Sequence, residues 1–339
     1  MSLVQDVLKG DRLALSRLLS KIENDTQEGQ DALAELFPHS GRAHLIGVTG
    51  APGTGKSSLV NQMAYHFRHP QGGSQPKKVA VVAVDPSSPF TGGAVLGDRI
   101  RMQALTGDPG VFIRSMASRG SLGGLAKATA GLVQVFDAVG FEIILIETVG
   151  AGQAEVDIAR LAHTTLVVEA PGLGDDIQAI KAGILEIADI LVVNKADRPG
   201  VENTERALLN MLKLAHPVQR VYRHHGSNIQ IETAPEVLAD DPLWIPPVLR
   251  TVATGEDGIP ELLAAVQQHY DHIVSTGDLQ RRERARLASE LDTRLMDDLV
   301  ARWWEANPDG RYDNILDQLL AREISPQQAV KALLNGEPS

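Results

Sequence analysis

Residues 50–57 hold the residue types from which a triphosphate site is built. Their sequence, Gly-Ala-Pro-Gly-Thr-Gly-Lys-Ser, fits G-x-x-x-x-G-K-[ST] at every defined position. Glycines let backbone N–H groups turn toward phosphate oxygens, Lys56 places a cation on the outer phosphates, and Ser57 offers a hydroxyl to Mg²⁺. We predict a P-loop nucleoside triphosphatase. The predicted nucleotide contacts of this loop are Gly50, Ala51, Pro52, Gly53, Thr54, Gly55, Lys56, Ser57 and Ser58.

Three carboxylates lie where a magnesium ion at such a site needs oxygen ligands. Asp85 ends the second expected strand, Glu147 ends the third, and Asp98 lies in a Gly-Asp-Arg loop. Strand ends of a parallel sheet face the ligand crevice, so we predict that these carboxylates reach the metal, directly or through water, beside Ser57. The alternative for each is a side chain that caps the next helix. Gly150 is predicted to donate its backbone N–H to the γ-phosphate.

A second motif, Asn-Lys-Ala-Asp at residues 194–197, follows the fifth expected strand. Asp197 can accept two hydrogen bonds from guanine N1–H and the exocyclic amine, a pair of donors that adenine lacks. The stem of Lys195 is expected to pack on the base plane, next to Asn194. With a phosphate loop upstream and a strand before it, the motif predicts guanine. The expected ligands are therefore GTP and GDP with Mg²⁺.

A further loop, Val252-Ala253-Thr254, is expected on another side of the base. GTPases usually place Ser-Ala here, with the Ala N–H near guanine O6. A backbone contact from Ala253 survives the replacement of Ser by Val252, whereas support from a Ser side chain does not.

The elements that position these motifs follow from apolar runs that alternate with helical patterns. Such an order implies an α/β fold with a mainly parallel sheet that is covered on both faces. Helical spacing of leucines predicts two helices within residues 3–37, before a break at Pro38 to Gly41. We predict an N-terminal helical extension (1–40), a nucleotide domain (41–275) and a helical arm (276–339). The expected strands are residues 44–50, 78–84, 141–147, 164–170, 190–194 and, as a sixth, 248–253.

Composition limits the partners of this chain. Its 339 residues carry a net charge of -11 and contain no cysteine. An acidic surface argues against nucleic acid as the main partner, and the short apolar runs argue against a membrane span. The lack of cysteine excludes disulfides and fits a cytoplasmic protein. Residues 280–286 form a charged run, which is typical of a solvated helix face. Beyond it, leucines spaced by four form a packing face, against this chain or a second copy.

Together these residues resemble the MeaB/ArgK family, the methylmalonyl-CoA mutase-associated GTPases. The resemblance implies a SIMIBI-class G domain and a homodimer formed through the C-terminal helical arm. It also implies a chaperone for an adenosylcobalamin-dependent acyl-CoA mutase, which couples GTP hydrolysis to loading and protecting the cofactor. The segments that carry it are Gly-Ala-Pro-Gly-Thr-Gly-Lys-Ser-Ser (50–58), Val-Asp-Pro-Ser-Ser-Pro (84–89), Gly-Asp-Arg-Ile-Arg-Met (97–102), Ser-Arg-Gly-Ser-Leu-Gly-Gly (118–124), Glu-Thr-Val-Gly-Ala-Gly-Gln (147–153), Pro-Gly-Leu-Gly-Asp-Asp-Ile-Gln-Ala-Ile-Lys (171–181) and Asn-Lys-Ala-Asp.

The resemblance also implies a mobile switch that communicates with the mutase at residues 171–181, with Asp175, Gln178 and Lys181 as its polar members. On sequence alone, this stretch reads equally as a glycine-rich loop that caps a helix.

Slow intrinsic hydrolysis is a further expectation. Ras-type proteins keep a water-positioning Gln where this chain has Ala151. Asp98 is our first candidate for that role and Gln153 the second. Lys56 and Mg²⁺ are expected to stabilise the charge on the transferring phosphoryl group, with Glu147 among the catalytic carboxylates. We predict that a partner accelerates the reaction.

Two other functional classes stay open at this point. One is an ATP-using kinase or transport-linked ATPase, which the motif at 194–197 disfavours. The other is a metal-insertion GTPase, for which the chain offers one His pair, His224 and His225, and no cysteine. The partner mutase is also open among those for methylmalonyl-CoA, isobutyryl-CoA and 2-hydroxyisobutyryl-CoA.

Overall fold

The computed structural model describes residues 2–86, 105, 107–118, 122–148, 159–172, 186–214, 243–307 and 310–335. They form two compact units, Met1–Arg286 and Leu287–Ser339. Helix α11 (Asp278–Ala306) begins in the first unit, which contains its first turns up to Arg286. The predicted division into three parts, with boundaries at 40 and 275, stays a prediction.

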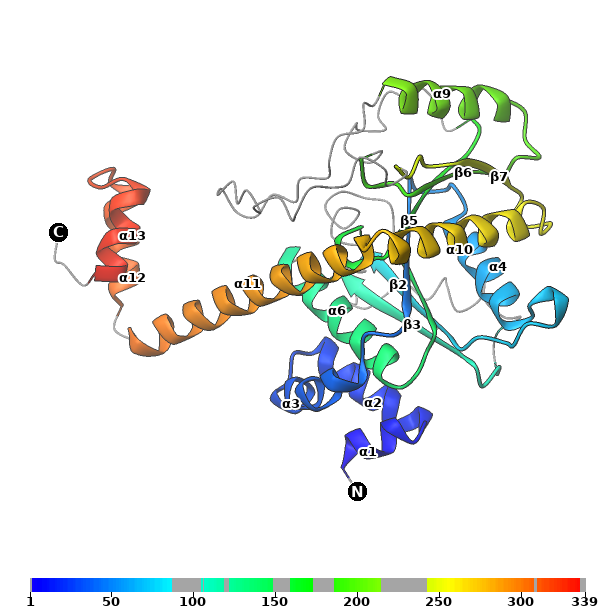
Figure 1. The fold of residues 1–339 in the computed structure, drawn as a ribbon. Helices are drawn as coiled ribbons and strands as arrows, with labels where there is room; N and C mark the ends of the chain where they lie inside the picture. Colours follow the sequence, from blue (N-terminus) through cyan, green and yellow to red (C-terminus); the bar gives the residue numbers. More distant parts are fainter. Residues whose placement is uncertain are drawn as a thin grey trace. The chain divides into compact units, whose positions relative to one another are not determined.

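A parallel sheet forms the centre of the first unit (Figure 1). In the described part of the chain it has seven strands in the order β3-β2-β4-β1-β5-β6-β7, and each neighbouring pair is parallel. This confirms the predicted α/β fold. The strands are β1 (His44–Thr49), β2 (Val79–Pro86), β3 (Val111–Ser118), β4 (Ile143–Thr148), β5 (Thr164–Glu169), β6 (Ile190–Asn194) and β7 (Val248–Thr251).

Strand β3 is the element that the sequence did not indicate. Its run, Val-Phe-Ile-Arg-Ser-Met-Ala-Ser, lacks the continuous apolar character of the central strands, because among the described strands it lies at the sheet edge and pairs with β2. Arg114 of β3 is half-buried and forms an ion pair with Glu23 at 2.5 Å. A polar residue is tolerated there because a neighbouring helix supplies its partner.

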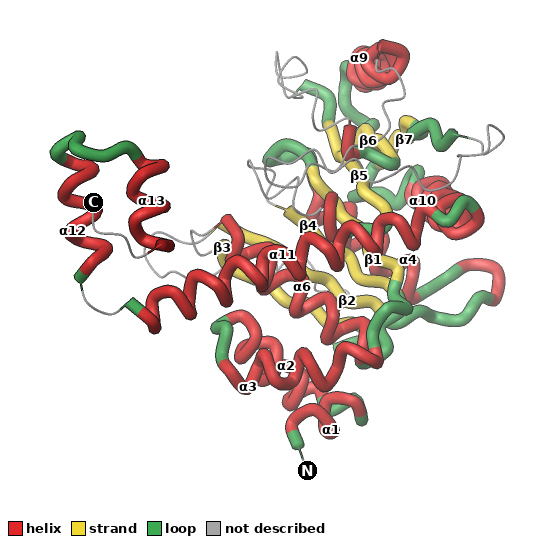
Figure 2. The backbone as a smooth tube through the Cα atoms, turned by 60° about the vertical axis from the view of Figure 1, so that its left-hand side comes forward, coloured by secondary structure: helices red, strands yellow, loops and turns green. Residues whose placement is uncertain are grey.

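Helices cover both faces of the sheet (Figures 1 and 2). One face packs on α4 (Lys56–Arg68) and α10 (Ile259–Ser275), and α9 (Val201–Leu214) packs on β6 and β7. The other face packs on α6 (Leu122–Ala138) and on an N-terminal bundle. That bundle has three helices, α1 (Leu3–Leu8), α2 (Arg12–Glu23) and α3 (Gln27–Leu36), where two were expected. The additional break lies at Gly10, whose φ of 87° interrupts the helical path.

The second unit contains most of α11 together with α12 (Arg311–Leu320) and α13 (Pro326–Asn335). The indole N–H of Trp303 donates to the carbonyl of Leu333 at 3.2 Å, which ties α11 to α13. Trp304 packs on Tyr312 of α12 with ring centroids 4.9 Å apart. Among the described residues, none of the helices has the length and apolar character needed to cross a membrane.

Candidate nucleotide site

The phosphate loop connects β1 to α4 at the carboxyl end of the sheet. Gly50, Gly53 and Gly55 have φ values of 139°, 84° and 93°, in the region that L side chains rarely adopt. A Cβ at Gly50 would lie 2.0 Å from the carbonyl oxygen of Val168, so only glycine fits against β5. The loop therefore has the backbone geometry that a phosphate cradle requires.

Lys56 is nearly buried, and its ammonium lies inside the loop. Its Nζ donates to the carbonyl oxygens of Gly50 at 2.7 Å and Ala51 at 2.9 Å. Thr54 closes the turn, because its hydroxyl donates to the Ala51 carbonyl at 3.0 Å. The cation is thus held at the centre of the loop, where phosphate oxygens would compete for it with two neutral carbonyls.

The side chains of Ser57 and Glu147 meet at the predicted metal position. The Ser57 hydroxyl donates to Glu147 Oε1 at 2.6 Å, and Glu147 is 6% exposed. A hydroxyl and a carboxylate that converge are hard oxygen donors of the kind that Mg²⁺ prefers. The residues present therefore fit a magnesium ion, which these two would hold. Ser58 is half-buried in the first turn of α4 and Pro52 is exposed.

The backbone brings Asp85 to the same edge of the sheet. Strand β2 pairs with β4 so that Ala83 lies opposite Glu147, and Asp85 follows two residues later. Six predicted site residues lie outside the described residues and stay predictions: Asp98, Gly150, Gln153, Asp175, Gln178 and Lys181.

Asn194 joins the phosphate loop to the predicted base loop. It is 1% exposed at the end of β6, and its Nδ2 donates to the Thr54 carbonyl at 2.9 Å. Its Oδ1 accepts from the Thr251 hydroxyl at 3.1 Å and from the Ala253 N–H at 3.2 Å. A Cβ at Gly55 would lie 2.5 Å from Asn194 Nδ2, which explains the glycine there. The side-chain amide of Asn194 thus joins the end of β6 to the phosphate loop and to the loop that follows β7.

The rest of the motif is placed for contact with a base. Lys195 has a φ of 58°, which is uncommon for a residue with a side chain and typical of functional sites. Its Nζ donates to the Gly53 carbonyl at 2.6 Å, so its stem lies along the phosphate loop. Asp197 and Thr254 are exposed, and Val252 is half-buried with its N–H bonded to the Asp257 carbonyl. The carboxylate of Asp197 is therefore accessible to a ligand.

Thr251 is the functional residue that sequence reasoning missed. The substitution of Ser by Val252 suggested a loop without side-chain support. Thr251, one residue earlier and 1% exposed, supplies the hydroxyl to Asn194 instead. A Thr that ends a strand directly before Val252-Ala253 was the available signal.

A second polar network, also missed, lies at the opposite end of the sheet. His44 Nε2 and His269 Nδ1 contact the Thr164 hydroxyl at 2.8 and 2.9 Å. His269 Nε2 lies 3.2 Å from Asp189 Oδ1, and both side chains are almost fully buried. Arg282 of α11 donates to both carboxylate oxygens of Asp189 at 3.1 Å. This network fastens the first turns of α11 to the starts of β1, β5 and β6.

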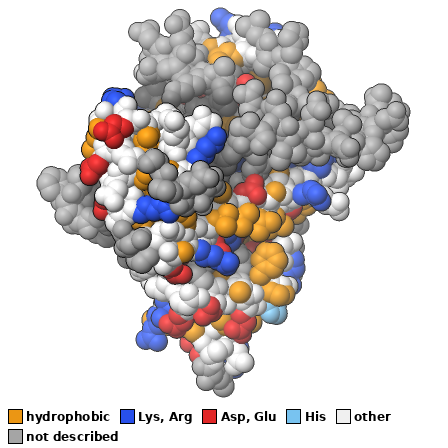
Figure 3. Space-filling model, turned by 90° about the vertical axis from the view of Figure 1, so that its left-hand side faces the viewer, with side chains coloured by type: hydrophobic (Ala, Val, Ile, Leu, Met, Phe, Trp, Pro, Cys, Tyr) orange, Lys and Arg blue, Asp and Glu red, His pale blue; other side chains and the backbone are white. Residues whose placement is uncertain are grey.

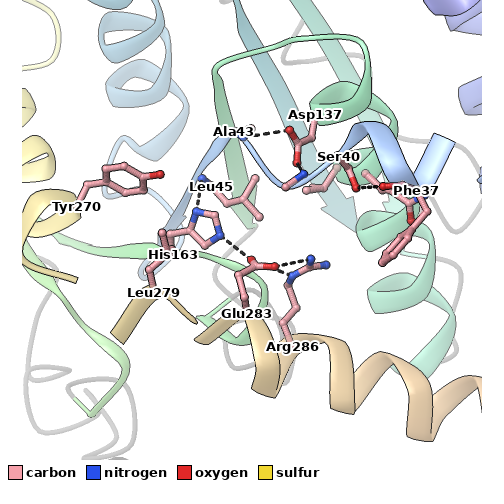
Figure 4. Close-up of a pocket in the computed structure, with 13 residues that line it drawn as sticks. Phe37, Ser40, Ala43, Leu45, Asp137, His163, Tyr270, Leu279, Glu283 and Arg286 are labelled. Atoms are coloured by element: carbon pink, nitrogen blue, oxygen red, sulfur yellow. Dashed lines mark hydrogen bonds and ion pairs between the residues drawn. The ribbon is translucent and has the colours of Figure 1, made fainter. Parts of the chain in front are cut away.

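Charges in this network are paired rather than available for ligands. Burial lowers the pKa of His44 well below its usual value. Burial alone would raise the pKa of Glu283, but hydrogen bonds from His163 and Arg286 lower it to about 2. His163 Nε2 lies 2.7 Å from Glu283 Oε1, and Figure 4 marks this interaction with a dashed line. These groups hold structure together.

A cavity of about 50 Å³ lies beside the network, between Tyr270, Glu283, Arg286 and the N-terminal segment at Phe37 (Figure 4). Such a volume admits one or a few water molecules and no nucleotide. The phosphate loop at the carboxyl end of the sheet therefore remains the candidate nucleotide site.

Comparison with known proteins agrees with this geometry. The family model described as "Methylmalonyl Co-A mutase-associated GTPase MeaB" matches residues 15–308. A protein of Pyrococcus abyssi that carries the name of a GTPase is 42% identical over 98% of this chain and 95% of its own length. A "Methylmalonic aciduria type A homolog, mitochondrial" of Caenorhabditis elegans is 29% identical over 88% of this chain and 73% of its own.

Among solved structures, a "LAO/AO transport system kinase" covers 98% of this chain and 95% of its own with a TM-score of 0.67 and 24% identity. At that identity the likeness concerns the fold alone. The family model covers most of the chain, and the phosphate loop and the hydrogen bonds of Asn194 agree with it. This chain therefore belongs to the MeaB family of methylmalonyl-CoA mutase-associated GTPases, and it hydrolyses GTP.

Proposed function

We propose that this GTPase loads and protects the adenosylcobalamin cofactor of an acyl-CoA mutase and that GTP hydrolysis times the transfer. The observation that carries the proposal is the match of residues 15–308 to a family named for its association with methylmalonyl-CoA mutase. The name of the Caenorhabditis elegans relative, which refers to methylmalonic aciduria, supports the same partner class. The nucleotide site supports the GTP-dependent part.

The described residues suggest how GTP acts. Phosphate oxygens would draw the Lys56 ammonium away from the Gly50 and Ala51 carbonyls, which it now contacts at 2.7 and 2.9 Å. Ser57 and Glu147 would separate to hold Mg²⁺, which neutralises charge that develops on the phosphoryl group. Asp98 or Gln153 would position the water. Slow hydrolysis by the protein alone remains part of the proposal, with residues 171–181 as the contact that a mutase uses.

The test combines binding and turnover with purified mutases. The protein with a non-hydrolysable GTP analogue, or with GDP, is mixed in turn with methylmalonyl-CoA, isobutyryl-CoA and 2-hydroxyisobutyryl-CoA mutase. We expect one of them to form a complex that depends on the nucleotide, to accelerate GTP hydrolysis and to receive adenosylcobalamin. Lys56→Ala, which removes the phosphate-loop cation, serves as the nucleotide-dead control. If no mutase binds or changes the hydrolysis rate, the proposed chaperone function is wrong.

Competition between nucleotides separates this function from that of an ATP-using kinase or transport ATPase. The exposed carboxylate of Asp197 pairs with the two donors of guanine, which adenine lacks. We expect excess GTP to prevent ATP binding and excess ATP to leave GTP binding unchanged. Equal competition would favour the ATP-using alternative.

A homodimer through the arm is the second part of the proposal. Helix α11 exposes a row of leucines at a spacing of four, and Leu291, Leu295 and Leu299 are 65%, 52% and 52% exposed. Figure 3 shows hydrophobic side chains grouped among charged ones on the face that it draws. A continuous apolar stripe of this kind is typical of a helix that packs on a partner. Light scattering should give twice the monomer mass, and Leu291→Glu with Leu295→Glu should give the monomer.

A further inference from the structure

Two buried threonines face each other between β1 and β4, directly below the phosphate site. The Thr148 hydroxyl donates to Thr49 Oγ1 at 3.0 Å, and the two residues are 1% and 0% exposed. Their neighbours on these strands are almost all aliphatic. Two hydroxyls in such a layer need an explanation, because polar groups inside an apolar core are costly unless they bond.

Alternation along the strands places the two threonines on one face and the metal ligands on the other. On β4, Ile143 and Leu145 pack with α4 and α10, whereas Ile144 and Ile146 pack with α6 and the N-terminal helices. Glu147 therefore points toward α4, where the Ser57 hydroxyl donates to its carboxylate, and Thr148 points to the α6 side. Thr49 of β1 is on that same side.

Each threonine is adjacent in the sequence to a residue of the candidate nucleotide site. Thr49 directly precedes Gly50, whose carbonyl accepts from Lys56 at 2.7 Å. Thr148 directly follows Glu147, whose carboxylate accepts from Ser57 at 2.6 Å. The hydroxyl bond therefore connects the last residue of β1 to the last residue of β4, next to the phosphate loop and Glu147.

Packing alone does not require these hydroxyls. Valine has nearly the same shape as threonine, and replacing both partners of a buried hydrogen bond by apolar groups of that shape is nearly neutral for stability. Strand pairing between β1 and β4 is already fixed from His44 to Val48. We therefore expect the bond to contribute little to the free energy of unfolding, and its place at the strand ends favours a role in the reaction.

We propose that Thr49 and Thr148 are positioning residues for GTP hydrolysis, which hold Glu147 in a fixed position relative to the phosphate loop. The inference rests on GTP hydrolysis and not on a mutase partner. Because a small misplacement of catalytic groups costs turnover more than ground-state binding, the pair acts on kcat.

The test separates positioning from stability. Thr148→Val should lower kcat for GTP hydrolysis about tenfold, with the Kd for GDP within about twofold of the original. Thr148→Ser, which keeps the hydroxyl, should restore kcat. The double variant Thr49→Val with Thr148→Val leaves no hydroxyl without a partner, so it should unfold at nearly the original denaturant concentration and still hydrolyse GTP about tenfold more slowly.

Thr165→Val is the matched control, because Thr165 is a buried threonine of β5, 1% exposed, near the opposite end of the sheet. It should keep the original kcat. A double variant with normal kcat would show that the pair is only structural and would overturn the proposal. An equal loss of kcat in Thr165→Val would do the same. If Thr148→Val fails to fold, the double variant decides the question.

Discussion

The cations at the two ends of the sheet have different kinds of partners. At the carboxyl end, the ammonium groups of Lys56 and Lys195 donate to main-chain carbonyls of the phosphate loop, those of Gly50, Ala51 and Gly53. At the amino end, the guanidinium of Arg282 pairs with the carboxylate of Asp189. Carbonyls are weak partners for a cation, whereas a carboxylate is a strong one.

This difference implies that the cations at the carboxyl end can exchange their carbonyl partners for phosphate, whereas Arg282 at the amino end keeps its carboxylate partner. Phosphate can displace a carbonyl from an ammonium, since it is the better acceptor. At the amino end, two aspartates, Asp189 and Asp278, raise the pKa of Arg282 despite the burial that would lower it. A bidentate buried pair has no comparable competitor. We therefore expect substitutions at the first end to change activity and those at the second to change stability.

Lys56→Ala should have the largest effect. Removing the cation at the centre of the phosphate loop should lower kcat/KM for GTP by a factor of about a thousand or more, because it stabilises the transferring phosphoryl group. Steady-state phosphate release measures this. Lys78→Ala, which removes an exposed lysine at the start of β2, is the matched control and should hydrolyse GTP normally. Retained activity in Lys56→Ala would refute the assigned site.

Arg282→Ala tests the other end. Loss of the guanidinium leaves the Asp189 carboxylate, 1% exposed, without that partner, and should lower the free energy of unfolding by about 3–5 kcal/mol. GDP affinity at low temperature should stay within about threefold, because the two ends act independently. Arg281→Ala, whose side chain is 56% exposed, should cost at most about 1 kcal/mol in the same urea titration. Equal losses would remove the proposed contrast.

Thr251→Val sharpens the assignment of the base loop. It removes one of the two donors to Asn194 Oδ1 that we describe and should weaken GDP binding about tenfold. Thr251→Ser should bind as the original does, because it keeps the hydroxyl. Fluorescent-nucleotide titration measures both. Unchanged affinity in Thr251→Val would mean that Ala253 alone positions the amide.

A pH titration should show the smallest effect, again at the amino end. The folded-state pKa of His44 is lowered by burial, so the unfolded chain takes up this proton first as the pH falls. Its contribution to stability is therefore complete above about pH 6.5 and is lost below that value, by at most about 1.4 kcal/mol per pH unit. Glu283, whose pKa is lowered to about 2, also loses its contribution to stability as the pH falls, but this loss occurs at lower pH than that of His44.

His44→Gln should flatten this part of the curve. The variant keeps a polar group near Thr164 but cannot be protonated. Urea unfolding between about pH 7.5 and about pH 5.5 measures the slope. A variant whose stability falls as steeply as that of the original chain would show that His44 does not cause this pH dependence.

Motifs with local physical causes could be predicted from the sequence. The phosphate loop is defined by glycines and a lysine at fixed spacing, and buried parallel strands by continuous apolar runs, so both were found. Strand β3 was missed because Arg114 and two serines break its pattern, and the partners that make this arginine acceptable, Glu23 and Ser20, lie on α2, far away in the sequence. No window of neighbouring residues contains this information.

Connections between distant residues explain the other omissions. Asp189 and Arg282 are far apart in sequence, and neither is part of a motif, so their pairing depends on the packing of β6 against α11. The charged run that contains Arg282 was interpreted as a solvated face. That interpretation is wrong for Arg282, whose side chain is 11% exposed because it faces Asp189. The roles of Asp98, Gln153 and residues 171–181 stay predictions.

The anchoring of α11 by Arg282 has a consequence for how such proteins can be divided or recombined. A chain that stopped at Ser275 would keep the phosphate loop and the guanine motif, yet it would lose the guanidinium that neutralises Asp189. The first turns of α11, up to Arg286, lie in the same compact unit as the phosphate loop. Exchange of arms between relatives should succeed when the junction is placed after Arg286 and fail when it is placed at residue 276.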